Sequence, residues 1–422
     1  MPHIRILGFA VLASGVASAQ STQPAAATQT AAKPGTQPTT QASTAPSVEG
    51  LLWSFATKAP SFGSAAAGDL NNDGEMDIVF GTYFNDEHLY AARARDGKIL
   101  WKFKSERGPI DTSVLLIDAD GDGQLNVLFG DSSTGTLFCL DGDGKPVWKF
   151  KGQTSTDSPP AAADLNGDGR LEIVYATMDA GGGGWVNALA AKTGTAIWSA
   201  RVPGHIQCET ALVDLDGDRT LDVLVTNWRG DNKLRALSGA DGKELWQFDT
   251  GDWIYHGVSV IEAAQRGDAS APSPAPDLIV ADRKGSVWRL NGRTGKELWR
   301  AKLEGEMDGT VFAPTCVANL TGDDAVEIVV CGLNLHVLDA NGKLLWRNAY
   351  GAGGRSITRG VAIADLDGDS QFELVFGAGT TLRAVRGDTG RELWSRELRC
   401  GSEFHEAIDQ APLILDCDGD GR

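Results

Sequence analysis

The chain has 422 residues, of which 42% are hydrophobic, and a formal net charge of −18. This length admits one large domain or two to three average ones. The acidic balance excludes a nucleic-acid partner, because phosphate binding needs clustered Lys and Arg. The 52 glycines follow no collagen-like period, and frequent tight turns between short strands account for them.

The N-terminal residues have the pattern of an export signal. His3 and Arg5 precede the apolar run ILGFAVLASGVA, and Ala19 ends an A-x-A cleavage site. Residues 1–19 are therefore predicted to be a Sec-type signal peptide, and residues 20–47, rich in Thr, Ala, Gln and Pro, a disordered linker. The apolar run is too short to span a membrane, and no later segment reaches that length. We expect a secreted or periplasmic protein whose domain covers residues 48–422.

An acidic motif recurs along this domain. It reads DLNNDGEMDIVFG from Asp69 and returns with the same spacing from Asp118, Asp164, Asp214, Asn319 and Asp365. Another copy begins at Asp416, and the copy in residues 262–280 keeps its apolar strand but has lost the acidic positions. A repeat of this kind indicates a fold built from equivalent units.

A tryptophan motif alternates with the acidic one and reads, for example, ADGKELWQF or RTGKELWRA. Its tryptophans are Trp101, Trp148, Trp198, Trp246, Trp299, Trp346 and Trp394. Trp53, in LLWSF, is an eighth member that lacks the preceding turn. Successive tryptophans are separated by 47 to 53 residues.

Each unit is predicted to hold four short strands. A small apolar strand precedes the acidic loop, a second follows it, and the third leads through an Asp-Gly, Asn-Gly or Thr-Gly turn into the tryptophan strand. Such dipeptides between apolar runs indicate hairpins, because tight turns need positive φ. Four-stranded antiparallel units at this period are typical of β-propeller blades.

We therefore predict an all-β fold, a propeller with seven complete blades and a partial eighth. Residues 411–415 and the strand around Trp53 would belong to the eighth blade, and its two middle strands would lie beyond Arg422. On this interpretation the sequence is a truncated form of an eight-bladed protein.

The two motifs resemble those of known repeat families. D-x-[ND]-x-D-G-x-x-[DE] before an apolar strand is similar to the FG-GAP or VCBS repeat of integrin-type propellers. The D-x-x-T-G-K-x-x-W half resembles the tryptophan-docking repeat of PQQ-type quinoprotein propellers. Together they cover residues 51–422. The resemblance implies the fold, but not one function, since such repeats occur in adhesion, carbohydrate-active and redox proteins.

The acidic loops have the chemistry of calcium sites, because calcium takes six to eight oxygen ligands from a flexible loop. A metal-free Asx-rich turn is the alternative for one loop, but six equivalent copies favour calcium in a structural role. The predicted ligands are Asp69, Asn71, Asp73, Asp77, Asp118, Asp120, Asp122, Asn126, Asp164, Asn166, Asp168, Glu172, Asp214, Asp216, Asp218, Asp222, Asn319, Asp323, Glu327, Asp365, Asp367, Asp369 and Glu373.

A ligand surface is expected on the opposite face, where the loops between second and third strands and the connections between blades lie. Aromatic rings beside charged groups suit a sugar or peptide, although the same residues would also serve to pack loops or fill the central channel. The candidates are Tyr83, Phe84, Trp185, Trp228, Trp253, Tyr255, His205, His256, Arg355, Arg359 and His405.

These features favour a monomeric, non-catalytic, calcium-binding propeller that binds a protein or carbohydrate, and no catalytic residue is assigned. A polysaccharide lyase similar to rhamnogalacturonan lyases is one alternative, since some calcium propellers cleave acidic glycans. A PQQ-dependent quinoprotein dehydrogenase is the other. The sequence has no adjacent cysteine pair and no C-x-x-C-H haem motif, so PQQ is not expected.

Overall fold

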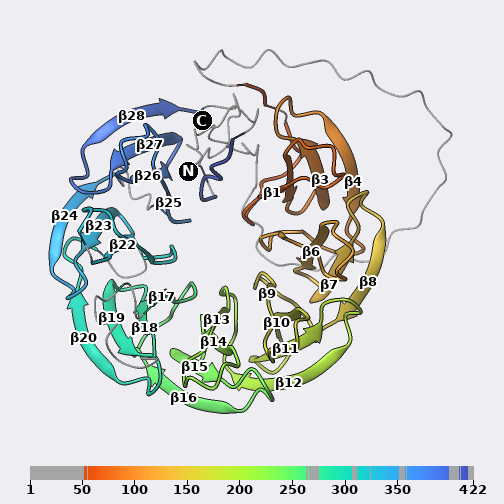
Figure 1. Cartoon of the computed structure of the whole chain (residues 1–422), viewed down its shortest axis with the longest axis horizontal. Helices are drawn as coiled ribbons and strands as arrows, with labels where there is room; N and C mark the ends of the chain where they lie inside the picture. Colours follow the sequence, from red (N-terminus) through yellow and green to blue (C-terminus); the bar gives the residue numbers. More distant parts are fainter. Residues whose placement is uncertain are drawn as a thin grey trace, which may run out of the picture.

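The computed structural model describes residues 52–54, 56–262, 265, 275–306, 311–323, 325–350, 357, 359–398, 408 and 410–416. These residues form seven four-stranded antiparallel sheets around a central axis (Figure 1). In each sheet the strands follow one another in chain order from the axis to the rim. The prediction of an all-β propeller with four-stranded blades is confirmed.

Blades 1 to 7 are numbered in chain order, from β1–β4 to β25–β28. The innermost strands have three residues each: β1 (Ala66–Gly68), β5 (Leu115–Ile117), β9 (Ala161–Ala163), β13 (Ala211–Val213), β17 (Ser259–Ile261), β21 (Cys316–Ala318) and β25 (Ala362–Ala364). The second strands follow the acidic loops: β2 (Asp77–Gly81), β6 (Asn126–Asp131), β10 (Glu172–Met178), β14 (Asp222–Thr226), β18 (Asp277–Ala281), β22 (Glu327–Cys331) and β26 (Glu373–Ala378).

The third strands precede the tight turns: β3 (His88–Arg93), β7 (Thr136–Leu140), β11 (Gly183–Ala190), β15 (Lys233–Leu237), β19 (Ser286–Asn291), β23 (Asn334–Leu338) and β27 (Thr381–Arg386). The outermost strands carry the tryptophans: β4 (Ile99–Lys104), β8 (Pro146–Lys151), β12 (Ala196–Pro203), β16 (Glu244–Asp249), β20 (Glu297–Lys302), β24 (Leu344–Ala349) and β28 (Glu392–Glu397).

The hydrophobic core is divided among the spaces between neighbouring blades. Val79 and Leu89 of blade 1, for example, pack in one cluster with Val127 and Phe129 of blade 2. Because each blade packs against a neighbour on both faces, its second strand is apolar without alternation, as in the fully buried DIVFG of β2. The core thus depends on contacts between blades as much as within them.

A β-bulge interrupts the pairing of the third and fourth strands in every blade. In blade 1, Ala91 pairs with Trp101 and Ala92 with Ile99, so Leu100 has no partner in the ladder. The residue at this position is apolar yet exposed in most blades; Ile197 in blade 3, for example, is 51% exposed. An extra residue increases the local twist of a strand and changes the direction of the next side chain. Here the next side chain is the tryptophan.

Seven of the motif tryptophans, from Trp53 to Trp346, reach the following blade. Trp198 donates its Nε1 hydrogen to the carbonyl of Gly239, at 2.7 Å. Equivalent bonds of 2.7–3.0 Å are made by Trp53, Trp101, Trp148, Trp246, Trp299 and Trp346. The indole also covers the glycine of the next tight turn, so that a Cβ added to Gly242 would lie 2.7 Å from Trp198 Cε3. The tryptophan motif therefore joins neighbouring blades.

Among the described residues the structure shows seven blades and no partial eighth. Residues 52–54 and 411–416, which were predicted to belong to that blade, lie in no strand. Leu413 and Leu415 pack on the blade 1 cluster that contains Ile78, while Ile414 packs on the blade 7 cluster. Figure 1 shows the dark-blue end of the described chain between these two blades.

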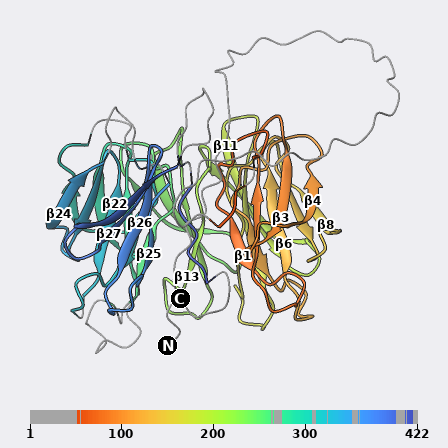
Figure 2. The ribbon, with the colours of Figure 1, turned by 90° about the horizontal axis from the view of Figure 1, so that it is seen from above.

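Strand alternation gives the propeller two different faces, seen edge-on in Figure 2. The acidic loops and the tight turns share one face, while the loops between second and third strands and the connections between blades share the other. In the part of the chain described here, no helix is long and apolar enough to cross a membrane. The predicted signal peptide and linker lie outside the described residues.

The tryptophan bond gives a test of the fold. Replacing Trp198 with Phe keeps a ring against the turn but removes the donor to the Gly239 carbonyl, so we expect a loss of about 1 kcal/mol in unfolding free energy. Urea unfolding followed by circular dichroism measures this loss. Ile197→Ala, which truncates the exposed neighbour, should change stability by less than about 0.5 kcal/mol. Equal effects of the two substitutions would contradict the proposed role of the bond.

Candidate functional site

The acidic loops fold through their own first side chain. In blade 2, Asp118 Oδ1 accepts the backbone N–H groups of Gly121 and Asp122 at 2.8 and 3.1 Å, and Oδ2 accepts that of Gly123 at 2.8 Å. These hydrogen bonds lower the pKa of Asp118, since they favour the charged form. Asp69, Asp164, Asp214 and Asp365 receive backbone hydrogens in the same way.

The ninth position of the loop is buried and bonded to the backbone at the loop start. The carboxylate of Asp77 accepts the N–H of Leu70 at 3.2 Å, and that of Asp222 accepts the N–H of Leu215 at 3.1 Å. Burial, opposed by this hydrogen bond, raises the pKa of both groups to about 6. Asn126, Glu172, Glu327 and Glu373 make the equivalent bond. Each ninth residue thus joins the two ends of its loop through a hydrogen bond.

Three loops bring acidic oxygens together. One oxygen from each of Asp118, Asp120 and Asp122 in blade 2 lies within 4.8 Å of the others, and the same holds for Asp214, Asp216 and Asp218 in blade 4 and for Asp365, Asp367 and Glu373 in blade 7. The loops of blades 2 and 4 fit a metal on their donor chemistry, because hard oxygen ligands converge from a short loop. These triads could bind a metal.

The remaining predicted metal ligands belong to no such triad among the described residues. In blade 1, Asp73 accepts the N–H of Glu75 at 2.8 Å, while Asp77 Oδ1 is buried without a hydrogen-bond partner among the described residues. Asn71 and Asn166 each accept a backbone hydrogen two residues on. In blade 6, Asn319 accepts the N–H of Gly322 and Asp323 that of Ala325. In blade 7, Asp369 accepts the N–H of Gln371 at 2.8 Å. That these residues bind metal stays a prediction.

On the opposite face, aromatic rings from a loop within blade 4 and from the connections between blades meet. This aromatic cluster consists of His205, Trp228, Trp253, Tyr255 and Phe312. Ring centroids are 6.1 Å apart for His205–Trp228, 6.0 Å for Trp228–Trp253, 6.3 Å for Trp253–Tyr255 and 4.4 Å for Tyr255–Phe312. All five rings are only partly buried. The structure therefore brings together four of the predicted ligand residues.

Two arginines lie over this cluster. The Arg283 guanidinium carbon is 4.1 Å from the centre of the Trp253 ring, and Arg283 Nε is held 2.9 Å from Asp252 Oδ1. The guanidinium carbon of Arg229 lies 5.9 Å from Trp228 and 5.8 Å from Trp253. The Nε1 of Trp228 is buried and has no hydrogen-bond acceptor among the described residues. The site thus combines apolar rings, positive charge and one unsatisfied donor.

A second group of rings surrounds Tyr83. Its ring centroid lies 4.9 Å from those of Phe62 and Phe84, and the guanidinium carbon of Arg359 lies 5.8 Å from the Phe62 ring. Phe84 is 44% exposed.

Trp185 and His256, two other predicted ligand residues, take part in neither group's ring contacts. Trp185 pairs with Thr177 and Arg201 within the sheet of blade 3, and none of the ring contacts found in the described residues includes it. His256 Nδ1 is 3.1 Å from Glu209 Oε2. Burial acts to raise the pKa of Glu209, but the charge and hydrogen bond of His256 outweigh it and lower that pKa to about 2. Arg355 and His405 lie outside the described residues.

Two acids that sequence reasoning missed lie at the blade connections of this face. Asp111 and Asp157 stand four residues before β5 and β9. Burial, and then the negative charge of Asp157, raise the pKa of Asp111 to about 7. Burial also raises the pKa of Asp157, although Gln207, Arg359 and His205 act against it. The two acids and Arg359 therefore influence one another's charge across the blade connections.

Phe312, Arg229, Arg283 and Phe62 were also missed as site residues. Arg229 follows Trp228 directly in TNWRGDNK, so the sequence carried a signal for it. Phe312 and Phe62 stand four residues before β21 and β1, the same offset as Asp111, Asp157, Gln207 and Tyr255. This shared offset of four residues before an inner strand can be read from the sequence, and it marks the residues that lie next to the inner strands.

Comparisons with known proteins agree with this architecture. Residues 230–416 match the PQQ-type repeat family described as outer membrane protein assembly factor BamB, and residues 118–175 match the FG-GAP-like repeat. The protein is therefore a β-propeller that carries FG-GAP-like and BamB-type PQQ repeats, as its motifs predicted.

Individual relatives are distant. Over 194 residues the chain is 26% identical to the tetrathionate hydrolase of Acidithiobacillus ferrooxidans, covering 43% of this chain and 35% of that one. Over 263 residues it is 27% identical to BamB of Burkholderia pseudomallei, covering 60% and 59%. The chain thus spans about a third to three fifths of the length of these relatives.

The biofilm matrix protein Bap1 of Vibrio cholerae has a similar solved structure, with a TM-score of 0.62 and 16% identity over 85% of this chain and 83% of that chain. At this identity the likeness shows the fold alone.

The raised pKa of Asp111 gives a pH test. The folded state binds this proton more tightly than the unfolded state, so the stabilisation is complete below the ordinary pKa of about 3.9 and is lost as pH rises through about 7. Asp111→Asn removes the titration, so the variant should gain stability relative to the wild type between pH 4 and pH 8. Urea unfolding at constant calcium measures the difference.

The matched control is Asp143→Asn, which changes an acid on an exposed turn that pairs with Lys145. Its stability difference from the wild type should stay within about 0.5 kcal/mol across the same range. A pH-independent difference for Asp111→Asn would show that Asp111 does not titrate in this window.

Proposed function

We propose that the protein is an exported, non-catalytic interaction module that works as a monomer. Its ligand, a protein or a carbohydrate, binds the aromatic cluster, while calcium in acidic loops of the opposite face stabilises the blades. The observation that supports this most is the cluster itself, in which five partly buried rings and two guanidinium groups from separate segments meet.

The composition of the cluster is that of a recognition surface. Trp, Tyr and Arg dominate binding hot spots, because they bury large areas and also offer polar groups. Aromatic faces serve equally to stack on sugar rings. The unsatisfied Nε1 of Trp228 favours a ligand with an acceptor at this point, because an unpaired buried donor costs about 1–3 kcal/mol.

An extracytoplasmic location is supported by the N-terminal signal pattern and by the relatives. One relative is named an outer membrane protein assembly factor and another a biofilm matrix protein. Outside the cytoplasm, calcium sites with dissociation constants of roughly 10⁻⁴ to 10⁻³ M are common and still fill.

Calcium would be held in blade 2 by Asp118, Asp120 and Asp122, and in blade 4 by Asp214, Asp216 and Asp218. Bound calcium would supply positive charge that neutralises these carboxylates. The residues themselves present converging oxygens within 4.8 Å, and Asp118 and Asp214 also hold the loop backbone in place. Like charges this close repel one another without a cation, so the folded state should bind the ion and gain stability.

We also propose that the space between blades 7 and 1 is an eighth blade position. Trp53 bonds to the Ala94 carbonyl and covers Gly97 as the other tryptophans do on the next blade. Residues 411–416 would supply the inner strand of this blade. Gln410 Nε2 donates to Ser61 Oγ across the junction. A structure that placed Trp53 and residues 411–416 in different sheets would contradict this proposal.

Calcium dependence is the first test. At 10 mM calcium, a site with a dissociation constant of about 1 mM contributes about 1.4 kcal/mol to stability. We expect chelation with EGTA to lower the melting temperature, and Asp120→Ala to reduce the calcium-dependent gain by about that amount. Differential scanning calorimetry at several calcium concentrations measures both effects.

Asp143→Ala is the control for the loss of one exposed negative charge, and it should keep the full calcium response. If EGTA leaves the melting temperature unchanged, these loops are metal-free turns.

Ligand binding is the second test. The double variant Trp228→Ala, Trp253→Ala should bind the partners of the wild type with at least tenfold lower affinity, because two hot-spot rings are removed. A glycan microarray and crosslinking capture from a periplasmic and outer-membrane extract provide the two readouts.

Val147→Ala removes an apolar side chain that is 51% exposed on the outer strand of blade 2, and it should bind as the wild type does. If the double variant still binds, the aromatic cluster is not the binding site. Unsaturated products from pectin fragments would show a lyase in place of a binding module.

A further inference from the structure

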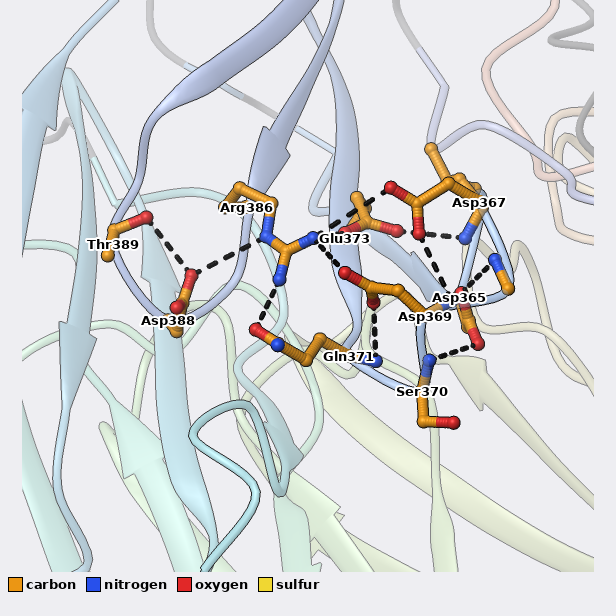
Figure 3. A network of polar contacts seen from close by, with 11 residues as sticks. Asp365, Asp367, Asp369, Ser370, Gln371, Glu373, Arg386, Asp388 and Thr389 are labelled. Atoms are coloured by element: carbon orange, nitrogen blue, oxygen red, sulfur yellow. Dashed lines mark hydrogen bonds and ion pairs between the residues drawn. The ribbon is translucent and has the colours of Figure 1, made fainter.

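The acidic loop of blade 7 contains a guanidinium group (Figure 3). Arg386 Nη1 lies 2.6 Å from Asp369 Oδ2, 3.3 Å from Glu373 Oε1 and 3.8 Å from Asp367 Oδ2. Nη2 donates to Gln371 Oε1, and Nε lies 3.7 Å from Asp388 Oδ1. A single cationic side chain therefore contacts three of the four residues that sequence analysis predicts as metal ligands in this loop.

The fold delivers Arg386 to this position. It is the last residue of β27 and pairs with Glu373, the first residue of β26. It also immediately precedes Gly387, whose carbonyl accepts the bond from Trp346. Only 9% of Arg386 is exposed, and Glu373 is fully buried. The guanidinium is thus held at the base of the loop and largely removed from water.

The equivalent position in the loops of blades 2 and 4 carries no cation. The residue before the tryptophan-accepting carbonyl is Asp141 in blade 2, where Trp101 bonds to Gly142, and Ser238 in blade 4, where Trp198 bonds to Gly239. Blade 1 has Arg93 there, paired with Asp77. Its Nη2 bonds to Asp96, and Nη1 lies 3.4 Å from Glu75. Arg93 therefore makes its ion pairs beside the predicted ligands of its loop.

The blade 7 loop has the same backbone shape as the others. Asp365 accepts the N–H groups of Gly368 and Ser370 at 2.7 and 2.9 Å, as Asp214 does with Gly217 and Arg219 in blade 4. The difference lies in what neutralises its carboxylates.

We propose that Arg386 takes the place of the metal in blade 7, so that this loop binds no calcium while the loops of blades 2 and 4 do. The inference rests on the calcium role proposed above. A divalent ion among these oxygens would lie within a few ångströms of a fixed positive charge and would be repelled by it. It would also have to take Asp369 and Glu373 from bonds they already make. Arg386 thus forms ion pairs with Asp367, Asp369 and Glu373.

The test locates terbium, a calcium analogue, in crystals of the full chain by anomalous diffraction, which reports each loop separately. In the wild type we expect peaks in the loops of blades 2 and 4 and none in blade 7. Arg386→Gln, which removes the charge but can still bond to neighbouring side chains, should gain a peak among Asp365, Asp367 and Glu373. Arg386→Lys keeps a cation near the loop and should gain none.

Arg93→Gln is the matched control, because it removes an arginine from the same position in blade 1, and it should leave blade 7 without a peak. A wild-type peak in the blade 7 loop, with Arg386 turned away, would overturn the inference, as would a blade 7 loop that stays empty in Arg386→Gln. Empty loops in blades 2 and 4 would instead refute the proposed calcium role. Melting temperatures of both glutamine variants, measured without metal, identify any that fail to fold.

Discussion

The propeller depends on the contact between a tryptophan and the tight turn of the next blade, which seven of the motif tryptophans make. The indole N–H donates to a carbonyl 2.7–3.0 Å away, which satisfies a half-buried donor, and the indole ring packs against a turn glycine. Gly194 has φ 66°, and a Cβ there would lie 2.4 Å from Trp148 Cε3. The turn therefore needs glycine twice, once for its backbone angle and once for the indole. The tight turn and the tryptophan are therefore two halves of one contact between neighbouring blades.

Because that contact holds the blades together at the rim, the two faces are free to differ. On one face, each acidic loop is ordered by bonds within itself, from its first side chain to the backbone and from its ninth side chain to the loop start. On the other face, the segments that carry Trp228, Trp253 and Phe312 come from different blades and order one another through ring contacts. The first face suits repeated stabilising sites, whereas the second can vary from blade to blade and form a single binding surface.

The sequence predicted the features that repeat in every blade, but it could not predict the contacts that occur only once in the molecule. Motif spacing was sufficient for the blades, the acidic loops and the tryptophan strands, because each depends on local chemistry that recurs. It also selected Trp228, Trp253, Tyr255 and His205, since aromatic residues in long loops are conspicuous. Phe312 and Arg283 were missed because their roles arise only when distant segments meet. Arg386 was missed for a different reason: an arginine at the end of a strand is ordinary, and only the fold directs it into the loop of the same blade.

The ninth-position acid shows how charge is handled in this propeller. It is kept even in blade 5, where the loop has lost its other acids: Asp277 is 1% exposed, and Arg289 Nε lies 2.8 Å from its Oδ2. Burying a carboxylate is costly unless it is paired or hydrogen-bonded. Because blade 5 keeps this acid without the other acids of the loop, the first role of the ninth-position acid is to stabilise the blade. The negative charge of this acid then also needs a neighbouring cation. In blades 5 and 7 an arginine of the same chain provides it. The acidic triads of blades 2 and 4 have no such arginine at the equivalent position, and this is why a metal ion is the cation that suits them.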